Sequence, residues 1–196
     1  MLSIKAVGFA IGLALVPVIA LADFCNTLAG GAHQTCRVKV QAGGSVIFEN
    51  WLRLAPERAT QSSTGKKGYF VSGTTPAVST LGTTTSKKPM LTIDCFMGNR
   101  SIRVGALPYM LGLANGSNKA FNLTFQIDTR TKFSERWSLD WKHAELKAPE
   151  GSQLANELQR SAKLTITTEG ILGRNSQTGY VFDTYGFDQM NLGLCR

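Results

Sequence analysis

The sequence has few of the residues, and none of the short motifs, on which most enzymes and metal sites depend. Its histidines are His33 and His143, and a serine or cysteine nucleophile needs such a base within hydrogen-bonding reach. His33 lies in a short segment between two cysteines, and His143 follows a Trp-Lys pair that is typical of a surface. Gly-x-Ser-x-Gly, His-Glu-x-x-His, a Gly-rich phosphate loop, a dinucleotide fingerprint and Cys-x-x-Cys do not occur. We therefore expect no enzyme, no zinc site and no cofactor.

Carboxylate pairs are the enzymatic arrangement that the composition leaves open. Acidic side chains lie in or beside predicted strands at Asp94, Glu135, Asp140 and Asp183, and two of them at a suitable separation would make a glycosidase. Because aspartate is common at strand ends and at outward positions, we favour a solvated face. A periplasmic cell-wall hydrolase, or an inhibitor of one, is the alternative function.

Long apolar runs are missing from the chain after its first residues. Residues 1–22 place Lys5 before an apolar stretch that ends with Ala20-Leu21-Ala22, which is the pattern of a signal peptide. The stretch is broken by Pro17 and is shorter than the ~20 residues that a bilayer requires, so we expect cleavage rather than a membrane anchor. The sequence predicts a periplasmic or secreted protein with no transmembrane segment after cleavage.

Basic residues outnumber acidic ones, 21 to 13, which gives a net charge of +8. The excess is spread over small clusters such as Lys66-Lys67, Lys87-Lys88 and Arg130 with Lys132, which is typical of a solvated face. Attraction to an anionic cell-wall polymer is the functional alternative. Nucleic acid is not expected as a partner, because the sequence has no basic-aromatic motif of a nucleic-acid-binding protein.

Four cysteines, an even number, follow the predicted signal peptide: Cys25, Cys36, Cys95 and Cys195. This usage is typical of disulfides formed in an oxidising compartment. Of the possible connectivities we favour Cys25–Cys36 with Cys95–Cys195, because the first pair closes a short Gly-rich loop and leaves the second. The second bond would tie the end of the chain to the core.

Strand patterns dominate the rest of the chain. Residues 23–73 predict a β-hairpin region, with strands at 36–40 and 45–49, and residues 74–88 predict a Ser/Thr/Gly-rich surface loop, with edge strands as the alternative. Residues 89–196 form the most regular region, and 23–196 are expected to be one domain. Apolar residues alternate with polar ones there, at Leu91, Ile93 and Cys95 and again at Phe121, Leu123, Phe125 and Ile127.

Two short helices interrupt the strands of this region. Leu154 and Leu158 lie four residues apart after Ser152, which predicts an amphipathic helix, and Phe187, Met190 and Leu194 predict a terminal helix. Strands of this length with turn signals between them are expected to pack as an antiparallel β-sandwich, stapled by the disulfides.

A basic and aromatic segment is the candidate surface for a partner. Arg136, Trp137, Trp141 and Lys142 would form a binding rim for a partner protein or an anionic polysaccharide if a tryptophan is exposed. The same-face spacing of the tryptophans favours the other outcome, in which both pack in the core.

A series of motifs in the second half of the chain occurs in a distinctive order. They are "KPMLTIDCFMGNRSIRV", "FQIDTR", "ERWSLDWKHAELKAPEGSQLANELQRSAKLTI" and "YVFDTYGFDQMNLGLC". In this order they resemble the TagO/VasI family of exported accessory proteins associated with type VI secretion, over about residues 88–195. The first half echoes that family only in "CNTLAGGAHQTC" and "ENWL". The resemblance implies a non-enzymatic envelope protein that contacts secretion-apparatus components or cell-wall material.

Overall fold

The computed structural model describes residues 43–81, 88–105, 120–140, 142–168 and 178–195. The predicted signal peptide and the Cys25–Cys36 bond lie outside these residues. The elements are β1 (Val46–Phe48), β2 (Trp51–Arg53), β3 (Glu57–Thr60), β4 (Lys67–Leu81), β5 (Met90–Phe96), β6 (Asn99–Gly105), β7 (Ala120–Ile127), β8 (Phe133–Asp140), β9 (Glu145–Lys147), α3 (Leu154–Glu157), β10 (Lys163–Thr168), β11 (Thr178–Asp183) and α4 (Phe187–Asn191). No helix among the described residues is long and apolar enough to cross a bilayer.

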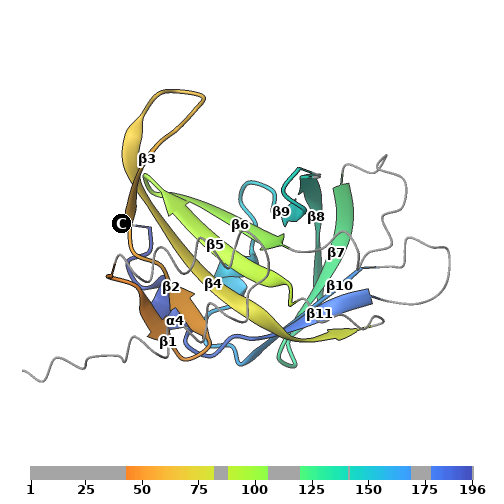
Figure 1. The fold of residues 1–196 in the computed structure, drawn as a ribbon. Coiled ribbons are helices and arrows are strands. Elements are labelled where there is room, and N and C mark those ends of the chain that lie inside the picture. The colour runs from red at the N-terminus through yellow and green to blue at the C-terminus, as the bar shows by residue number, and fades with distance from the viewer. Residues whose placement is uncertain (1–42, 82–87, 106–119, 141, 169–177, 196) are drawn as a thin grey trace, which may run out of the picture.

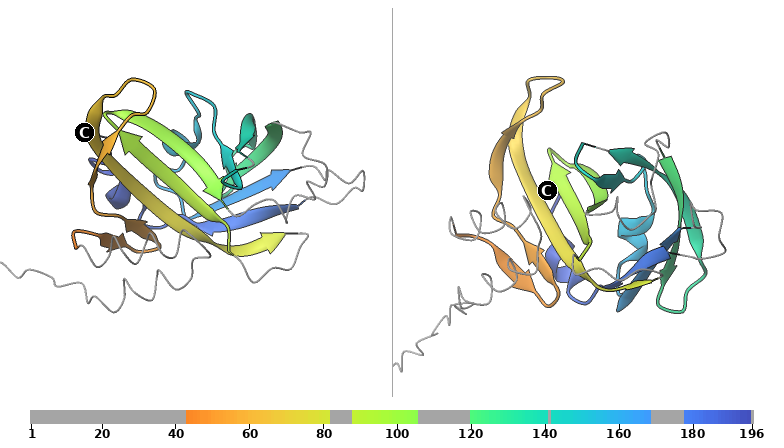
Figure 2. Two further views of the ribbon diagram at one scale, coloured as in Figure 1. Left: turned by 45° about the horizontal axis from the view of Figure 1, so that its top comes forward. Right: turned by 45° about the vertical axis from the view of Figure 1, so that its right-hand side comes forward.

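Eight of the described strands close into an antiparallel barrel. The order around the ring is β4-β5-β6-β9-β8-β7-β10-β11, and the ring closes because β4 pairs with β5 along one edge and with β11 along the other. Figure 2 shows the ring from its side and obliquely along its axis. The expected β-sandwich is therefore wrong. Alternating strands satisfy a sandwich and a barrel equally well, and the pairing of Ala77 with Phe182 that closes the ring leaves no local signal.

Strand β4 also corrects the loop prediction. Residues 74–81 are not loop but the second half of this strand, and Thr74 and Thr75 are buried. They lie where β2 pairs with β4, at the pair Leu52 and Thr74. Ser, Thr and Gly gave no apolar alternation, so the sequence reads as loop there. Residues 82–87 of the predicted loop lie outside the described residues.

Side chains fill the interior of the barrel. The alternation predicted for β5 and β7 is confirmed, because Leu91, Ile93 and Cys95, like Phe121 through Ile127, place every second side chain in the core. The Phe125 ring stacks on Phe133 at 5.0 Å and lies 5.5 Å from the Trp137 ring. An eight-stranded barrel is just wide enough for such rings, so they leave little free volume.

One end of the barrel is closed by the end of the chain, and we call it the sealed end. The predicted Cys95–Cys195 disulfide is confirmed there, and both short helices form close to their predicted positions. The Phe187 ring of α4 lies 5.3 Å from the Trp51 ring, and Arg53 Nη1 donates to the Leu192 carbonyl at 3.0 Å. At the opposite end, which we call the far end, β4, β6, β8 and β10 finish.

Two hairpins extend from the barrel wall, as Figure 1 shows. The β1–β2 hairpin pairs with β4 near its middle, and β3 pairs with the start of β4, Lys67 to Phe70, beyond the barrel. The predicted strand at 45–49 corresponds to β1, which pairs with β2 among the described strands. The predicted strand at 36–40 lies outside the described residues.

Candidate functional site

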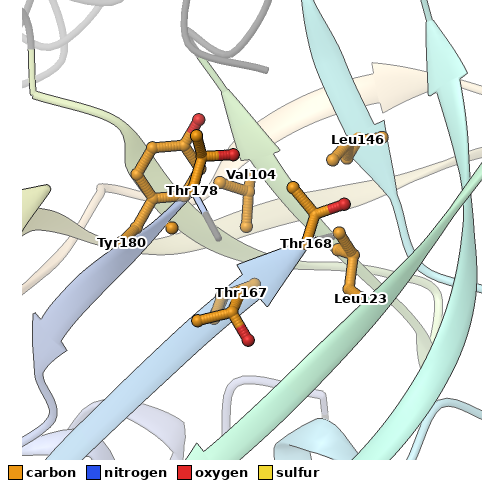
Figure 3. Close-up of a pocket in the computed structure, with 9 residues that line it drawn as sticks. Val104, Leu123, Leu146, Thr167, Thr168, Thr178 and Tyr180 are labelled. Carbon is orange, nitrogen blue, oxygen red and sulfur yellow. The ribbon is translucent and has the colours of Figure 1, made fainter. Parts of the chain in front are cut away.

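A small hollow lies inside the far end of the barrel, between β6, β7, β9, β10 and β11 (Figure 3). Its volume is about 10 Å³, which is about what one water molecule requires. The Tyr180 ring is 2% exposed, and neither its hydroxyl nor that of Thr178 has a hydrogen-bond partner in the structure as described. Burial raises the pKa of Tyr180, so its hydroxyl is neutral. The hollow has room for water but not for a substrate.

The first of the candidate carboxylates, Asp94, lies on the outer wall and is only 4% exposed. It accepts hydrogen bonds from the Ser72 hydroxyl and from Arg103 Nε, the latter at 2.8 Å. Arg103 Nη1 also bonds Glu145 Oε1 at 2.5 Å. These residues stand on four neighbouring strands, so they form cross-strand ion pairs that fix the wall.

The second, Glu135, points inward toward the start of α3. Its carboxylate accepts hydrogen bonds from Trp137 Nε1 at 2.9 Å, from the Ser152 hydroxyl at 2.7 Å and from the Gln153 amide at 2.8 Å. The Ser152 hydroxyl also accepts a bond from the Leu154 amide at 3.3 Å, while the N-cap of α3 is Gln153. Glu135 thus joins a barrel strand to the helix that covers the barrel, which is a structural task.

The remaining carboxylates also have structural partners. Asp140 accepts hydrogen bonds from Lys147 Nζ at 2.6 Å and from His143 Nδ1 at 2.8 Å, and these donors hold its pKa well below the usual range. Asp183 accepts the Tyr185 amide at 3.0 Å. The described residues contain no group of three or more His, Cys, Asp or Glu that would hold a metal ion.

The predicted rim of Arg136, Trp137, Trp141 and Lys142 does not form as a unit. Trp137 is 0% exposed and packs in the barrel core, so it is not a surface residue. Arg136 and Lys142 are exposed, and Trp141 lies outside the described residues. The pattern that predicted burial for Trp137 was correct, and the alternative that placed it on a surface is wrong.

A basic hairpin that the sequence reasoning did not single out projects from the barrel (Figures 1 and 2). We call it the ribbon; it comprises β3, the turn 61–66 and residues 67–70 of β4. Arg58 pairs with Tyr69 and Thr60 with Lys67, so these four side chains share one face. Tyr69 is 58% exposed, and Arg58 and Lys67 are exposed beside it. The Lys66-Lys67 pair was the available signal.

Backbone hydrogen bonds and one side-chain contact hold the ribbon together. The Gln61 amide donates to the Lys66 carbonyl at 2.8 Å and the Gly65 amide to the Gln61 carbonyl at 2.8 Å, which closes its turn. On the other face, Met97 lies over Gly68, where a Cβ would approach Met97 Cγ to 2.5 Å. Along its second edge, β3 pairs with no other described strand.

The fold class is thus a disulfide-locked, closed antiparallel barrel with a projecting basic ribbon. A comparison with models of protein families found no match. Comparisons with curated proteins and with solved structures also found none.

Proposed function

We propose that this protein is a non-enzymatic, exported interaction module, and that the ribbon docks on an acidic protein of the cell envelope. The observation that carries the proposal is the exposed face of Arg58, Lys67 and Tyr69 on a projecting hairpin. The cations of Arg58, Lys66 and Lys67 form no ion pair with any other described residue, so their charge is available to a partner.

The chemistry of the ribbon favours a protein over a free polymer as this partner. A tyrosine ring between cations is typical of a binding hot spot, where the ring is buried and the charges steer the approach. Along its second edge, at Arg58–Thr60, β3 pairs with no other described strand; such an edge can add a strand through backbone hydrogen bonds, which a polymer without amides cannot use in the same way.

The state of the carboxylates supports a non-enzymatic role. A glycosidase needs one carboxylic acid and one carboxylate that face a substrate. Asp94 and Glu135 instead bond to Ser72, Arg103 and the start of α3. The resemblance of residues 88–195 to the TagO/VasI family supports placing the partner in a type VI secretion apparatus, as a proposal.

Photo-crosslinking in living cells tests the ribbon. With p-benzoylphenylalanine in place of Tyr69, we expect one discrete crosslinked envelope protein of acidic composition, and with the same residue in place of Arg136 we expect none. The double substitution Arg58→Glu/Lys67→Glu should reduce the yield several-fold, and so should added salt. A crosslink from position 136 and not from 69 would transfer the function to the predicted rim.

Incubation with purified peptidoglycan tests the enzymatic alternative. We expect no release of soluble muropeptides above the buffer control. Release that is abolished by Glu135→Gln would overturn the proposal in favour of a hydrolase. For the secretion role, a gene far from any type VI cluster, together with a crosslinked partner unrelated to secretion, would remove that part.

A further inference from the structure

A second hollow opens at the sealed end, between the connection from α3 to β10 and the connection from β11 to α4. Its volume is about 140 Å³, much larger than the hollow at the far end. Pockets for drug-sized ligands are about 300–1,000 Å³. This one therefore fits a single small ring rather than a larger molecule.

The accessible surface of the hollow is more polar than apolar, and apolar side chains lie beneath it. Leu158 and Phe187 are buried and belong to the barrel core. Beside them the Ser161 hydroxyl donates to the Leu158 carbonyl at 2.7 Å, so the proton between Ser161 and Thr184, 2.7 Å apart, comes from Thr184. Both residues are buried, so these hydroxyls join the two connections beneath the hollow.

The mouth of the hollow offers donors and acceptors without net charge. Asp188 Oδ2 accepts the Arg160 amide at 3.1 Å, and its carboxylate retains further acceptor capacity. The guanidinium of Arg160 and the amide of Gln189 form no side-chain hydrogen bond with another described residue. Because Arg160 and Asp188 balance each other, the mouth suits a neutral, hydroxyl-bearing ligand better than a phosphate or a carboxylate.

An exposed aromatic ring stands at the wall. Tyr185 is 59% exposed and lines the hollow, while its amide is fixed by Asp183 and its carbonyl accepts the Asn50 amide at 3.4 Å. An exposed tyrosine presents an apolar face and a polar tip. A sugar ring has the complementary surface, since its C–H groups pack on an aromatic face and its hydroxyls reach polar groups at the edge.

We propose that this hollow binds one neutral sugar ring of a glycan, with Tyr185 against the ring face and Arg160, Asp188 and Gln189 at its hydroxyls. The inference goes beyond the proposed function, because it concerns another surface and does not require the ribbon to bind. If both hold, the protein connects an envelope protein to a glycan.

Titration of the ¹⁵N-labelled protein, purified from the periplasm of an expressing host, tests the inference. The probe is the neutral β-1,4-linked trimer of N-acetylglucosamine, raised to about 10 mM because a single-ring site is weak. We expect saturable amide shifts at Arg160, Tyr185, Asp188 and Gln189. A trimer of galacturonic acid, which carries carboxylates, should bind at least several-fold more weakly.

The chain supplies a matched control, because Tyr69 on the ribbon is exposed to the same degree as Tyr185. Tyr185→Ala should weaken binding of the trimer about tenfold, and Tyr69→Ala should leave it unchanged. Conversely, Tyr69→Ala and not Tyr185→Ala should affect crosslinking to the envelope partner, so the two proposals fail separately. Unchanged melting temperatures show that both variants fold, and Gln189→Ala provides a second test.

Two outcomes would overturn the inference. One is the absence of saturable shifts around the hollow in the unmodified protein, a result that depends on no variant. The other is tighter binding of the galacturonic acid trimer than of the neutral trimer, because the balanced charges of the mouth would then not select the ligand.

Discussion

Single charged side chains on the outer wall of the barrel are paired across neighbouring strands. Arg103 forms ion pairs with Asp94 and Glu145, and Lys147 forms one with Asp140. Each of these contacts joins residues at least seven positions apart in the chain. These pairs alternate in sign around the wall. They therefore support the strand register more than they attract a charged partner.

Asp140 gives this wall a predictable response to acid. Lys147 and His143 hold the pKa of Asp140 well below the value of ~3.9 for an unfolded chain. The stability from this group is therefore present above the unfolded pKa and is lost as the pH falls through the folded pKa. We expect Asp140→Asn to lower the melting temperature at pH 7 and the difference from the unmodified protein to shrink below pH 4. Thermal melts from pH 2 to pH 7 measure this, and a constant difference would contradict it.

Burial of single residues was largely predictable from the sequence. The two-residue period placed Leu91, Phe121 and Trp137 in the core correctly, because alternation records which side of a strand is apolar. For Asp94 the alternation predicted the direction of the side chain but not its burial. It faces outward as predicted, yet it is buried, because Ser72 and Arg103 on the neighbouring strands cover it.

At the scale of elements, α4 is placed by glycines rather than by its own length. A Cβ on Gly73 would lie 1.9 Å from Met190 Sδ, so the Met190 side chain of α4 packs directly over this glycine of β4. Gly186, which precedes α4, has φ +87°, and a Cβ there would lie 2.0 Å from the Phe48 carbonyl oxygen. The short helix is thereby fixed against both β1 and β4.

Gly186→Ala tests this placement. The backbone conformation and the contact with Phe48 both oppose a Cβ, so we expect the free energy of unfolding to fall by about 2–3 kcal/mol and the amides of α4 to exchange faster. Gly98→Ala is the control, because Gly98 has φ +79° with no neighbouring atom within 4 Å and should cost only about 1 kcal/mol. Equal losses in urea unfolding would mean that the contact with Phe48 is unimportant.

Elements were predictable where hydrophobicity varied along the chain. Strands β5, β7 and β10 and both helices follow from apolar spacing, whereas the second half of β4 does not. Thr74 and Thr75 there are buried because β2 and β5 pair with β4 on both sides, a tertiary cause that the local sequence cannot record. The hollow beside Tyr185 was missed for the same reason, since it joins two connections that are distant in sequence.

At the scale of the molecule, ring closure is what the sequence left undetermined. A sandwich and a barrel bury the same alternate residues, and the choice depends on whether β11 pairs with β4. The disulfide was predictable because it needed only a count of cysteines and a local loop for the other pair. It joins residues with a sequence separation of 100.

Removal of this disulfide should lower the stability of the whole barrel. In the chain-entropy model a loop of this length contributes about 4–5 kcal/mol, so Cys195→Ser should lower the urea midpoint clearly and expose α4 to exchange first. Reductant should bring the unmodified protein toward the variant. Coincident unfolding curves of variant and unmodified protein under oxidising conditions would contradict the prediction.

The position of β11 and of Cys195 also sets an order of events when the chain is made. The ring cannot close until residues 178–183 are available to pair with β4, and the disulfide cannot form until Cys195 has emerged. Everything earlier in the barrel must wait as an open sheet with two unpaired edges, which is the state most prone to pairing with other chains. A chain truncated before residue 178 would therefore be expected to accumulate as aggregate rather than as a slightly weakened barrel.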